Sequence, residues 1–256
     1  MKQPDYCIYP TLLDSFTNYL DSDIIYERYW GWNNNPQYTQ EEFRDQQFQG
    51  LIDRINRKPF DSEVADRGTV LNEIVDCMVE KRKSEIMQID KLYDNTDQII
   101  ALKASFNGRE FTFPISFCNE LYQYYKGGLV QQRVEAILPT IFGNVLVYGV
   151  IDYLMPTTVN DLKTTGNYTV GKFKGHHQHL VYPYCLLSNG SDVRTFEYNI
   201  VEFTKSGYIV DTYTETYVFK PERDIPILTN HCEEFIRFLE DNKNLITNKK
   251  IFGGEN

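Results

Sequence analysis

The sequence lacks the features that mark membrane-spanning and secreted proteins. No apolar run approaches the roughly 20 residues that a membrane helix needs. The first six residues, Met1 to Tyr6, lack the apolar core of a secretory signal. The five cysteines are odd in number and scattered from Cys7 to Cys232, which is typical of reduced thiols rather than of a disulfide framework. We therefore expect a cytoplasmic protein with no membrane partner.

Positive charge is also scarce. The chain has 26 Lys and Arg against 36 Asp and Glu, for a net charge of −10, whereas general nucleic-acid binders are normally basic. Any contact with nucleic acid would therefore need a local basic groove. Two candidate patches exist, although charge alone favours solvated surfaces for both: one of Lys172, Lys174, His176 and His177, and one of Arg54, Arg57, Lys58 and Arg67.

The length allows one large domain over residues 1–256, without internal repeats. Residues 1–60 carry helical patterns around Thr11 to Tyr29 and Gln40 to Arg57, separated by a Gly-, Asn- and Pro-rich break. We expect a helical N-terminal extension over 1–60 and a core over 61–256. The expected fold class is α/β, with a mixed central sheet between two layers of helices.

Further along the core, the patterns predict hairpins and helices. Asn107-Gly108 lies between alternating runs and predicts a type I′ hairpin, inserted at about residues 98–115. The remaining predictions are a helix over Phe117 to Lys126, a hairpin of Thr195 to Thr204 with Tyr208 to Phe219, and an amphipathic helix over Glu222 to Leu245.

Two aspartates and a lysine form the most informative feature of the chain. Val145 to Tyr153 is apolar on both faces, as in a buried strand, and Val159 to Thr165 resumes an extended pattern after a turn at Pro156. This turn makes Asp152 the cross-strand neighbour of Asp161, with β-carbons roughly 5 Å apart. Like charges at that distance repel, and a hard divalent cation with oxygen ligands would compensate them.

The same strand places a lysine beside the carboxylates. Because side chains alternate along a strand, Asp161 and Lys163 share one face while Leu162 points to the other. Such a set suits phosphodiester hydrolysis with Mg²⁺, in which a lysine orients water or offsets developing charge. The alternative is a surface turn with solvated charges. Asp241-Asn242-Lys243 repeats the pattern, but in a charged helix where the residues do not share a face, so we treat it as a decoy.

A helix is expected from about Phe173 to Leu187, with Gln178 and Tyr182 on one face because they are four residues apart. Pro183 could kink this helix. The cations Lys172, Lys174, His176 and His177 before it could hold a phosphate backbone. A zinc site is not supported, since no cysteine or Glu-x-x-His spacing accompanies the histidines. Ordinary core packing is the alternative for the tyrosines of this helix.

Taken in order, Gly149 to Asp152, Asp161-Leu162-Lys163 and Gln178 to Tyr182 resemble successive motifs of the PD-(D/E)XK nuclease superfamily, in its RecB-like and phage exonuclease branch. The resemblance implies a restriction-endonuclease-like α/β/α core. It implies metal ligation by Asp152, Asp161 and the Leu162 carbonyl, and a catalytic lysine at Lys163. It also implies that Gln178 and Tyr182 occupy the Gln-x-x-x-Tyr motif.

An upstream segment matches this family less well. Arg67 to Glu73 is similar to a glycine-led turn that opens a helix in RecB-like enzymes, here running to about Lys83, but Asn72 stands where they usually carry histidine. A carboxamide oxygen can still coordinate Mg²⁺, and Glu73 could supply another ligand or be a solvated first-turn glutamate. Glu135 looks like the acidic residue that relatives place on the first core strand; otherwise it is the solvent-side residue of an alternating strand.

These observations lead us to expect a Mg²⁺-dependent nuclease, with Mn²⁺ as a substitute metal, that hydrolyses DNA, in exonuclease mode, in phage or mobile-element recombination or repair. The scattered cysteines predict no iron–sulfur cluster. A homo-oligomer and a single-strand annealing recombinase partner follow only from the resemblance. Two alternatives stay open: an inactive nuclease-fold protein for DNA binding or assembly, and an unrelated aromatic-rich interaction protein. RNA as substrate also stays open.

Overall fold

The computed structural model describes residues 3–253, which form a mixed central sheet of six strands in the order β1-β6-β7-β8-β9, with β5 on the other edge of β6. The pairs β1·β6 and β7·β8 are parallel, and the pairs of β5 with β6, β6 with β7 and β8 with β9 are antiparallel. The strands are β1 (Tyr6–Ile8), β5 (Leu129–Thr140), β6 (Gly143–Leu154), β7 (Thr158–Thr165), β8 (Thr195–Phe203) and β9 (Ile209–Val218). The predicted α/β class with a mixed sheet is confirmed.

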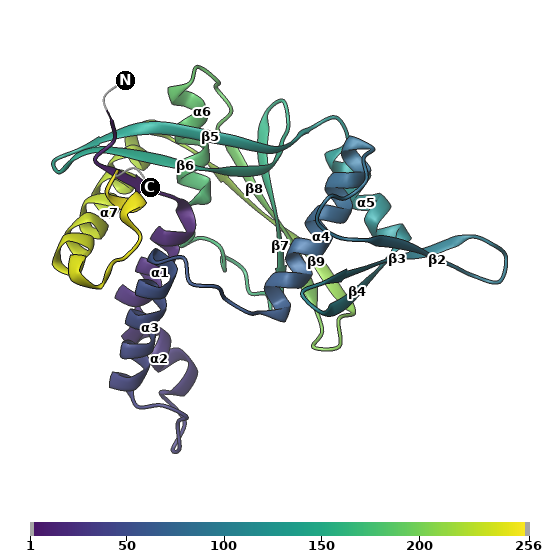
Figure 1. The fold of residues 1–256 in the computed structure, drawn as a ribbon, viewed down its shortest axis with the longest axis horizontal. Helices are drawn as coiled ribbons and strands as arrows, with labels where there is room; N and C mark the ends of the chain where they lie inside the picture. Colours follow the sequence, from purple (N-terminus) through teal and green to yellow (C-terminus); the bar gives the residue numbers. More distant parts are fainter. Residues whose placement is uncertain (1–2, 254–256) are drawn as a thin grey trace.

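Helices and a small second sheet cover the two faces of this sheet (Figure 1). The helices are α1 (Pro10–Leu20), α2 (Ser22–Trp30), α3 (Gln40–Ile55), α4 (Glu63–Glu80), α5 (Ile115–Tyr125), α6 (Gln178–Ser188) and α7 (Pro221–Asp241), followed by short 3₁₀ turns at Lys243–Leu245 and Lys249–Phe252. One buried core joins α1, α3, α6 and α7 to the sheet, and a second joins α4, α5 and the small sheet to its other face. The result is three layers.

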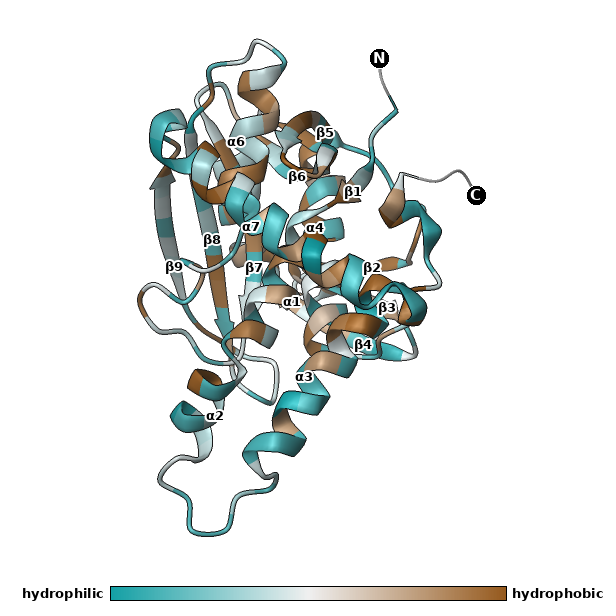
Figure 2. Cartoon of the chain, turned by 90° about the vertical axis from the view of Figure 1, so that its left-hand side faces the viewer, coloured by the Kyte–Doolittle hydropathy of each residue, from teal (hydrophilic) through white to brown (hydrophobic). Residues whose placement is uncertain are grey.

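The predicted N-terminal extension contributes directly to the main core. Leu13 and Phe16 of α1 and Leu51 of α3 are buried there, and β1 adds a parallel strand to the central sheet. The connection between α2 and α3 projects from the body and is hydrophilic (Figure 2). At its end, Thr39 and Glu42 form a capping box that starts α3. This region therefore belongs to the layer that flanks the sheet.

The Asn107-Gly108 hairpin is confirmed. Both turn residues have positive φ, 49° and 74°, as a type I′ turn requires, between β3 (Ile99–Phe106) and β4 (Arg109–Pro114). The structure adds a third strand, β2 (Ile89–Tyr93), antiparallel to β3. The predicted hairpin is therefore two strands of a three-stranded sheet that packs with α4 and α5.

Two helix starts differ from the prediction. Helix α6 begins at Gln178 rather than at Phe173, because Glu215 of β9 accepts the backbone N–H groups of Gly171 (3.0 Å) and Phe173 (3.3 Å). These donors are thus satisfied outside a helix. Helix α4 begins at Glu63, capped by Ser62, so that Gly68 lies inside it and not at its opening turn.

No helix within residues 3–253 is long and apolar enough to cross a membrane.

Candidate active site

The site lies beside a stretch of β6 that has no paired strand along one of its two edges. Strand β5 pairs along β6 from Gly143 to Leu154, so β1 and β7 must share the opposite edge. On that edge β1 pairs only with Val145 to Val147, and β7 pairs only with Tyr153 and Leu154. On this edge, Tyr148 to Asp152 have no strand partner among the described residues, although β5 pairs along their other edge. Polar side chains from β7 and α6 can therefore approach β6 here.

Asp152 and Asp161 face one another at the end of the β6–β7 ladder. The last pair is Tyr153 with Asn160, so the same register places Asp152 opposite Asp161 one step further. The backbone pairing stops there, and the Asp152 Oδ2 accepts the Leu162 backbone N–H at 3.1 Å instead. The predicted register is thus correct, but a side chain replaces the next rung of the ladder.

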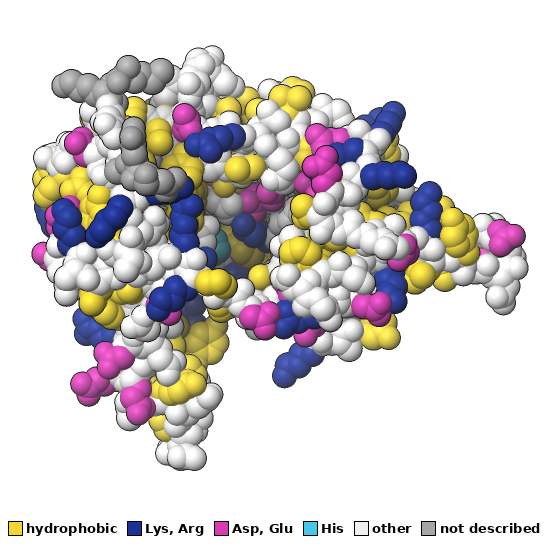
Figure 3. Space-filling view, in the orientation of Figure 1, with side chains coloured by type: hydrophobic (Ala, Val, Ile, Leu, Met, Phe, Trp, Pro, Cys, Tyr) yellow, Lys and Arg dark blue, Asp and Glu magenta, His cyan; other side chains and the backbone are white. Residues whose placement is uncertain are grey.

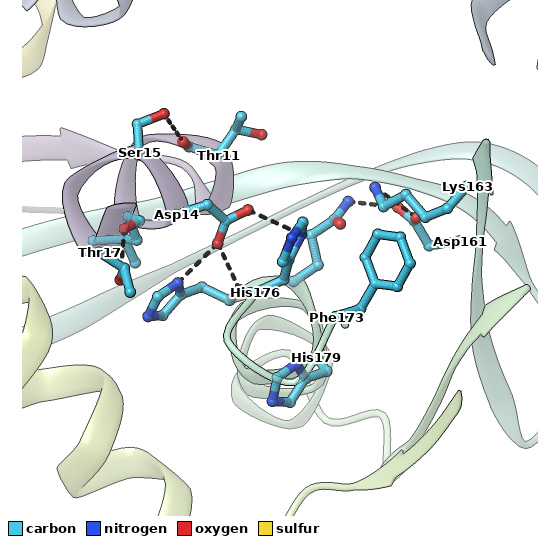
Figure 4. A network of polar contacts seen from close by, with 12 residues as sticks. Thr11, Asp14, Ser15, Thr17, Asp161, Lys163, Phe173, His176 and His179 are labelled. Carbon is cyan, nitrogen blue, oxygen red and sulfur yellow. Dashed lines mark hydrogen bonds and ion pairs between the residues drawn. The ribbon is translucent and has the colours of Figure 1, made fainter. Parts of the chain in front are cut away.

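Asp161 is almost fully buried, at 1% exposure, and is held by two side chains. Its Oδ1 accepts a hydrogen bond from the Gln178 amide, which in turn lies 3.3 Å from the Tyr182 hydroxyl. Lys163 Nζ lies 2.7 Å from Asp161 Oδ2, at ion-pair distance but without hydrogen-bond alignment, so this oxygen has no hydrogen-bond donor among the described residues. Figure 4 shows Asp161 and Lys163 side by side. Leu162 points into the second core, as alternation predicted.

The electrostatics reflect two acids sharing a confined space. Burial raises the pKa of Asp152 well above its usual range, and repulsion from Asp161 raises it further, against the opposing effects of Lys163 and the Leu162 N–H. For Lys163, burial lowers the pKa, but the attraction of Asp161 and Asp152 outweighs it, so the pKa is raised. The lysine is therefore held as a cation beside the carboxylate pair.

Tyr182 reaches the site because the strand beneath it has no side chain. A Cβ on Gly149 of β6 would lie 2.4 Å from Tyr182 Cε1, which is closer than real contacts allow. Only glycine permits this approach. The glycine of β6 and the Gln178–Tyr182 pair of α6 are thus parts of one arrangement that fixes Asp161.

Helix α4 supplies the far wall. Asn72 Nδ2 lies 3.3 Å from the Leu162 carbonyl oxygen, while Asn72 Oδ1 is buried without a hydrogen-bond partner among the described residues. One turn later, Asp76 accepts a hydrogen bond from Gln131 at 3.0 Å, and burial raises its pKa to about 6. Sequence reasoning missed Asp76. The four-residue spacing from Asn72, which places both on one helix face, was the available signal.

Glu73 and Glu135, two predicted ligands, are engaged elsewhere. Arg82 binds Glu73 through two hydrogen bonds of 2.7 and 3.1 Å. Although burial raises the pKa of Glu73, these bonds outweigh it and lower the pKa. Glu135 is exposed, pairs with Arg133 at 2.9 Å, and lies opposite Tyr148 on β6. That position is roughly 13 Å along the strand from Asp152. Glu135 therefore lies away from the aspartate pair, whereas Glu73 lines the same pocket as Asp152 with its carboxylate bound to Arg82.

The predicted phosphate-binding patch before α6 does not form one surface. Lys172 Nζ is taken up by Thr165 and the Asn167 carbonyl. His177 is buried and binds Asp14 of α1 through both its backbone N–H and its ring, each at 2.8 Å, and the ring of His176 lies 3.5 Å from the same carboxylate (Figure 4). Burial lowers the pKa of His176.

Of that set, Lys174 is exposed and makes no side-chain hydrogen bond or ion pair within the described part of the chain. The histidines instead tie α6 to α1. The role of Asp14 in this tie was not visible in the sequence.

A pocket of about 650 Å³ opens beside the carboxylates, between α4 and the strands β5, β6 and β7. Its wall includes Asn72, Asp76, Asp152, Leu162 and Lys163. Figure 3 shows a hollow at the centre of this face of the molecule, with acidic and basic atoms at its base. This is the space in which a substrate phosphate could meet the site.

The oxygen donors of this pocket suit a hard cation. Asn72 Oδ1 and Asp76 Oδ1 are buried and lack hydrogen-bond donors among the described residues, and the Asp152 carboxylate lines the same pocket. Within residues 3–253, no three His, Cys, Asp or Glu side chains form a ready metal-ligand group. Mg²⁺ does not need one, because it binds through one or two carboxylates and keeps several waters. The residues present therefore fit Mg²⁺.

Comparisons with known proteins give no family. The chain matches no protein-family model and no curated protein. A solved crystal structure named SSO0001 is similar over 93% of this chain and 78% of its own, with a TM-score of 0.41 and 11% identity. A likeness this distant carries no argument about function.

Proposed function

We propose that this protein is a metal-dependent nuclease that hydrolyses DNA phosphodiester bonds. The observation that carries the proposal is the aspartate pair at the end of the β6–β7 ladder, with Lys163 Nζ 2.7 Å from Asp161. Burial and the charge of Asp161 raise the pKa of Asp152, so keeping both aspartates charged costs free energy. An ordinary surface turn has no reason to carry that cost. A divalent cation would relieve that cost by balancing the two negative charges.

Asp152, Asp161 and the Leu162 carbonyl would hold Mg²⁺, with Mn²⁺ as a substitute. When bound, the metal polarises a phosphoryl oxygen and lowers the pKa of water. Asn72 holds the Leu162 carbonyl through its amide nitrogen, and we assign it this positioning role. Asp76, on the same face of α4, is a stronger candidate for an additional acidic ligand than Glu73, whose carboxylate Arg82 occupies.

The other residues prepare the site for this chemistry. Lys163 remains protonated because the two aspartates raise its pKa. Its ammonium group can therefore orient a water molecule or offset charge that develops on the phosphate. Gln178 fixes one oxygen of Asp161, and Tyr182 lies within hydrogen-bond distance of the Gln178 amide. The second oxygen of Asp161 forms the ion pair with Lys163.

Exonuclease mode, a role in phage or mobile-element recombination and an annealing recombinase partner come from the family resemblance alone. The competing proposal is an inactive nuclease-fold protein for DNA binding or assembly. It is favoured by Asn72, which stands where an active relative would carry histidine and which hydrogen-bonds the backbone.

The proposal is tested by incubating the protein with end-labelled linear DNA and with circular DNA, each in Mg²⁺, Mn²⁺ or EDTA. We expect metal-dependent loss of the linear DNA only, and no loss with Asp161→Ala. Cleavage of circular DNA would replace the exonuclease mode with an endonuclease mode. Retained DNA binding without cleavage in either metal would favour the inactive protein.

A further inference from the structure

A second and larger cavity, of about 840 Å³, lies next to the site, between the helices α1 and α3 and the strands β5 and β6. We name it the basic groove and define it by Tyr9, Arg54, Arg57, Lys58, Arg133 and Tyr148, all of which line it. Arg54, Arg57 and Lys58 belong to the second candidate basic patch of the sequence, and none of the groove residues has a role in the proposed cleavage chemistry.

The groove carries excess positive charge in a protein of net charge −10. Two of its four cations have acidic partners: Lys58 pairs with Asp53 and Arg133 with Glu135. Arg54 and Arg57 have no carboxylate partner within the described residues. Both are exposed; Arg54 lies in the last turn of α3 and Arg57 just beyond its C-terminal cap. Neither positive charge is balanced by a carboxylate, so both can bind a polyanion.

Aromatic rings lie among these cations. The rings of Tyr9 and Tyr148 are 5.8 Å apart, Arg57 donates a hydrogen bond to the Tyr148 hydroxyl at 3.2 Å, and the Arg133 guanidinium lies over the Tyr148 ring. Cations that hold phosphates next to rings that stack on bases form the usual arrangement for single-stranded nucleic acid. A duplex hides its base faces from such rings.

The groove and the site pocket lie next to each other along β6. Gly149 and Val150 line the groove, and Asp152, two residues further along the strand, lines the pocket. Tyr182 also lines the groove, and it lies within hydrogen-bond distance of the Gln178 amide that binds Asp161. Tyr148 and Asp152 lie roughly 13 Å apart along the strand, about four stacked nucleotides.

We propose that the basic groove binds a single strand of DNA and leads it to the aspartate pair. Arg54 and Arg57 contact the phosphates, and Tyr148 stacks on a base. This inference rests on the proposed nuclease function, because it treats the groove as the path of that enzyme's substrate. It adds that the substrate at this site is an unpaired strand.

The test measures binding of a fluorescent single-stranded oligonucleotide by anisotropy, in EDTA so that no cleavage occurs, with the wild-type protein and four variants. The Arg54→Glu, Arg57→Glu double variant should weaken binding at least about tenfold and reduce the slope of log K against log salt by about 0.7 per lost phosphate contact. Tyr148→Ala should weaken binding about tenfold, and Tyr148→Phe, which keeps the ring, should not. Arg44→Glu is the matched control, since Arg44 is exposed on α3 outside the groove.

Four results would contradict the proposal that the groove binds a single strand of DNA. They are no binding by wild-type protein, unchanged binding by the double variant, an affinity for an abasic oligomer equal to that for the normal oligonucleotide, or competition by poly-glutamate as strong as by unlabelled oligonucleotide. The last would indicate an acidic protein as the partner. Binding that depends on the groove, without cleavage in Mg²⁺, would keep the groove as a single-strand binding site and reject both the nuclease and delivery of a substrate to the aspartate pair. Cleavage in Mg²⁺, together with unchanged affinity in the groove variants, would keep the nuclease and reject the groove as the binding path.

Discussion

The site depends on single residues whose size or charge has no substitute. Gly149 is one, because its missing side chain gives Tyr182 the space next to β6 from which it reaches Gln178. Asp161 is another, with one oxygen bound to Gln178 and the other next to Lys163. At this scale the geometry of the site follows from a small number of atoms.

Replacing Gly149 with alanine should destabilise the protein by about 1–3 kcal/mol, because the new methyl group would have to displace the Tyr182 ring. Urea denaturation measures the change. Gly50→Ala is the control: its Cβ would meet nothing within 4 Å, and it lies inside α3. That change should instead stabilise by up to about 1 kcal/mol. Equal effects of the two substitutions would refute the packing argument.

Asp76 should make stability depend on pH. Its pKa is about 6 when folded and 3.8 as the ordinary value. As pH rises, the unfolded chain therefore loses this proton at a lower pH than the folded protein does. The contribution of Asp76 to the free energy of unfolding falls by roughly 3 kcal/mol as pH rises from about 4 to about 6. Asp76→Asn should remove that fall. Thermal melts in EDTA at pH 4.5 and 7.5 provide the measurement, and a variant with the same pH dependence as wild type would contradict it.

At the scale of elements, much of the arrangement is legible in the sequence. Apolar runs on both sides of Pro156 predict the β6–β7 register, and Asn107-Gly108 predicts the β3–β4 turn. The start of α6 is not legible, because it depends on Glu215, a residue of β9 distant in sequence. Strand β2 was also missed, since its two half-buried residues, Ile89 and Leu92, are three apart and so lack the alternation of a half-buried strand.

The site shows the same division. Asp152, Asp161, Lys163, Gln178 and Tyr182 come together as the motifs imply, because they lie on the regular elements β6, β7 and α6. Glu73, His176 and His177 instead bind residues outside this set. Their partners, Arg82 and Asp14, are set by tertiary packing that no local pattern encodes.

The ion pair of Glu73 and Arg82 gives a prediction for α4. Glu73→Gln should destabilise the protein by roughly 2 kcal/mol, because a buried, charge-assisted contact is weakened. It should leave Mg²⁺ affinity unchanged, since the carboxylate is already occupied. Calorimetric titration with Mg²⁺ checks this, with Asp161→Asn as the variant that should lose binding. Loss of Mg²⁺ binding in a folded Glu73→Gln protein would make Glu73 a ligand after all.

On the scale of the whole molecule, the acidic surface and the basic groove have separate roles. The site pocket lies between α4 and the central sheet, and the basic groove lies between α1, α3 and the same sheet. The net charge of −10 repels nucleic acid from most of the surface. Arg54 and Arg57, which have no carboxylate partner among the described residues, give a polyanion an attractive surface next to Asp152 and Asp161.

The most direct measurement of the central claim compares the two Asp-x-Lys segments of this chain. Asp161→Asn and Asp241→Asn make the same chemical change, one at the aspartate pair and one at the end of α7. We predict that the Mg²⁺-dependent cleavage rate of a labelled oligonucleotide falls at least about a hundredfold in the first. It should be unchanged in the second. Equal rates in two well-folded variants would show that the aspartate pair is not the catalytic site.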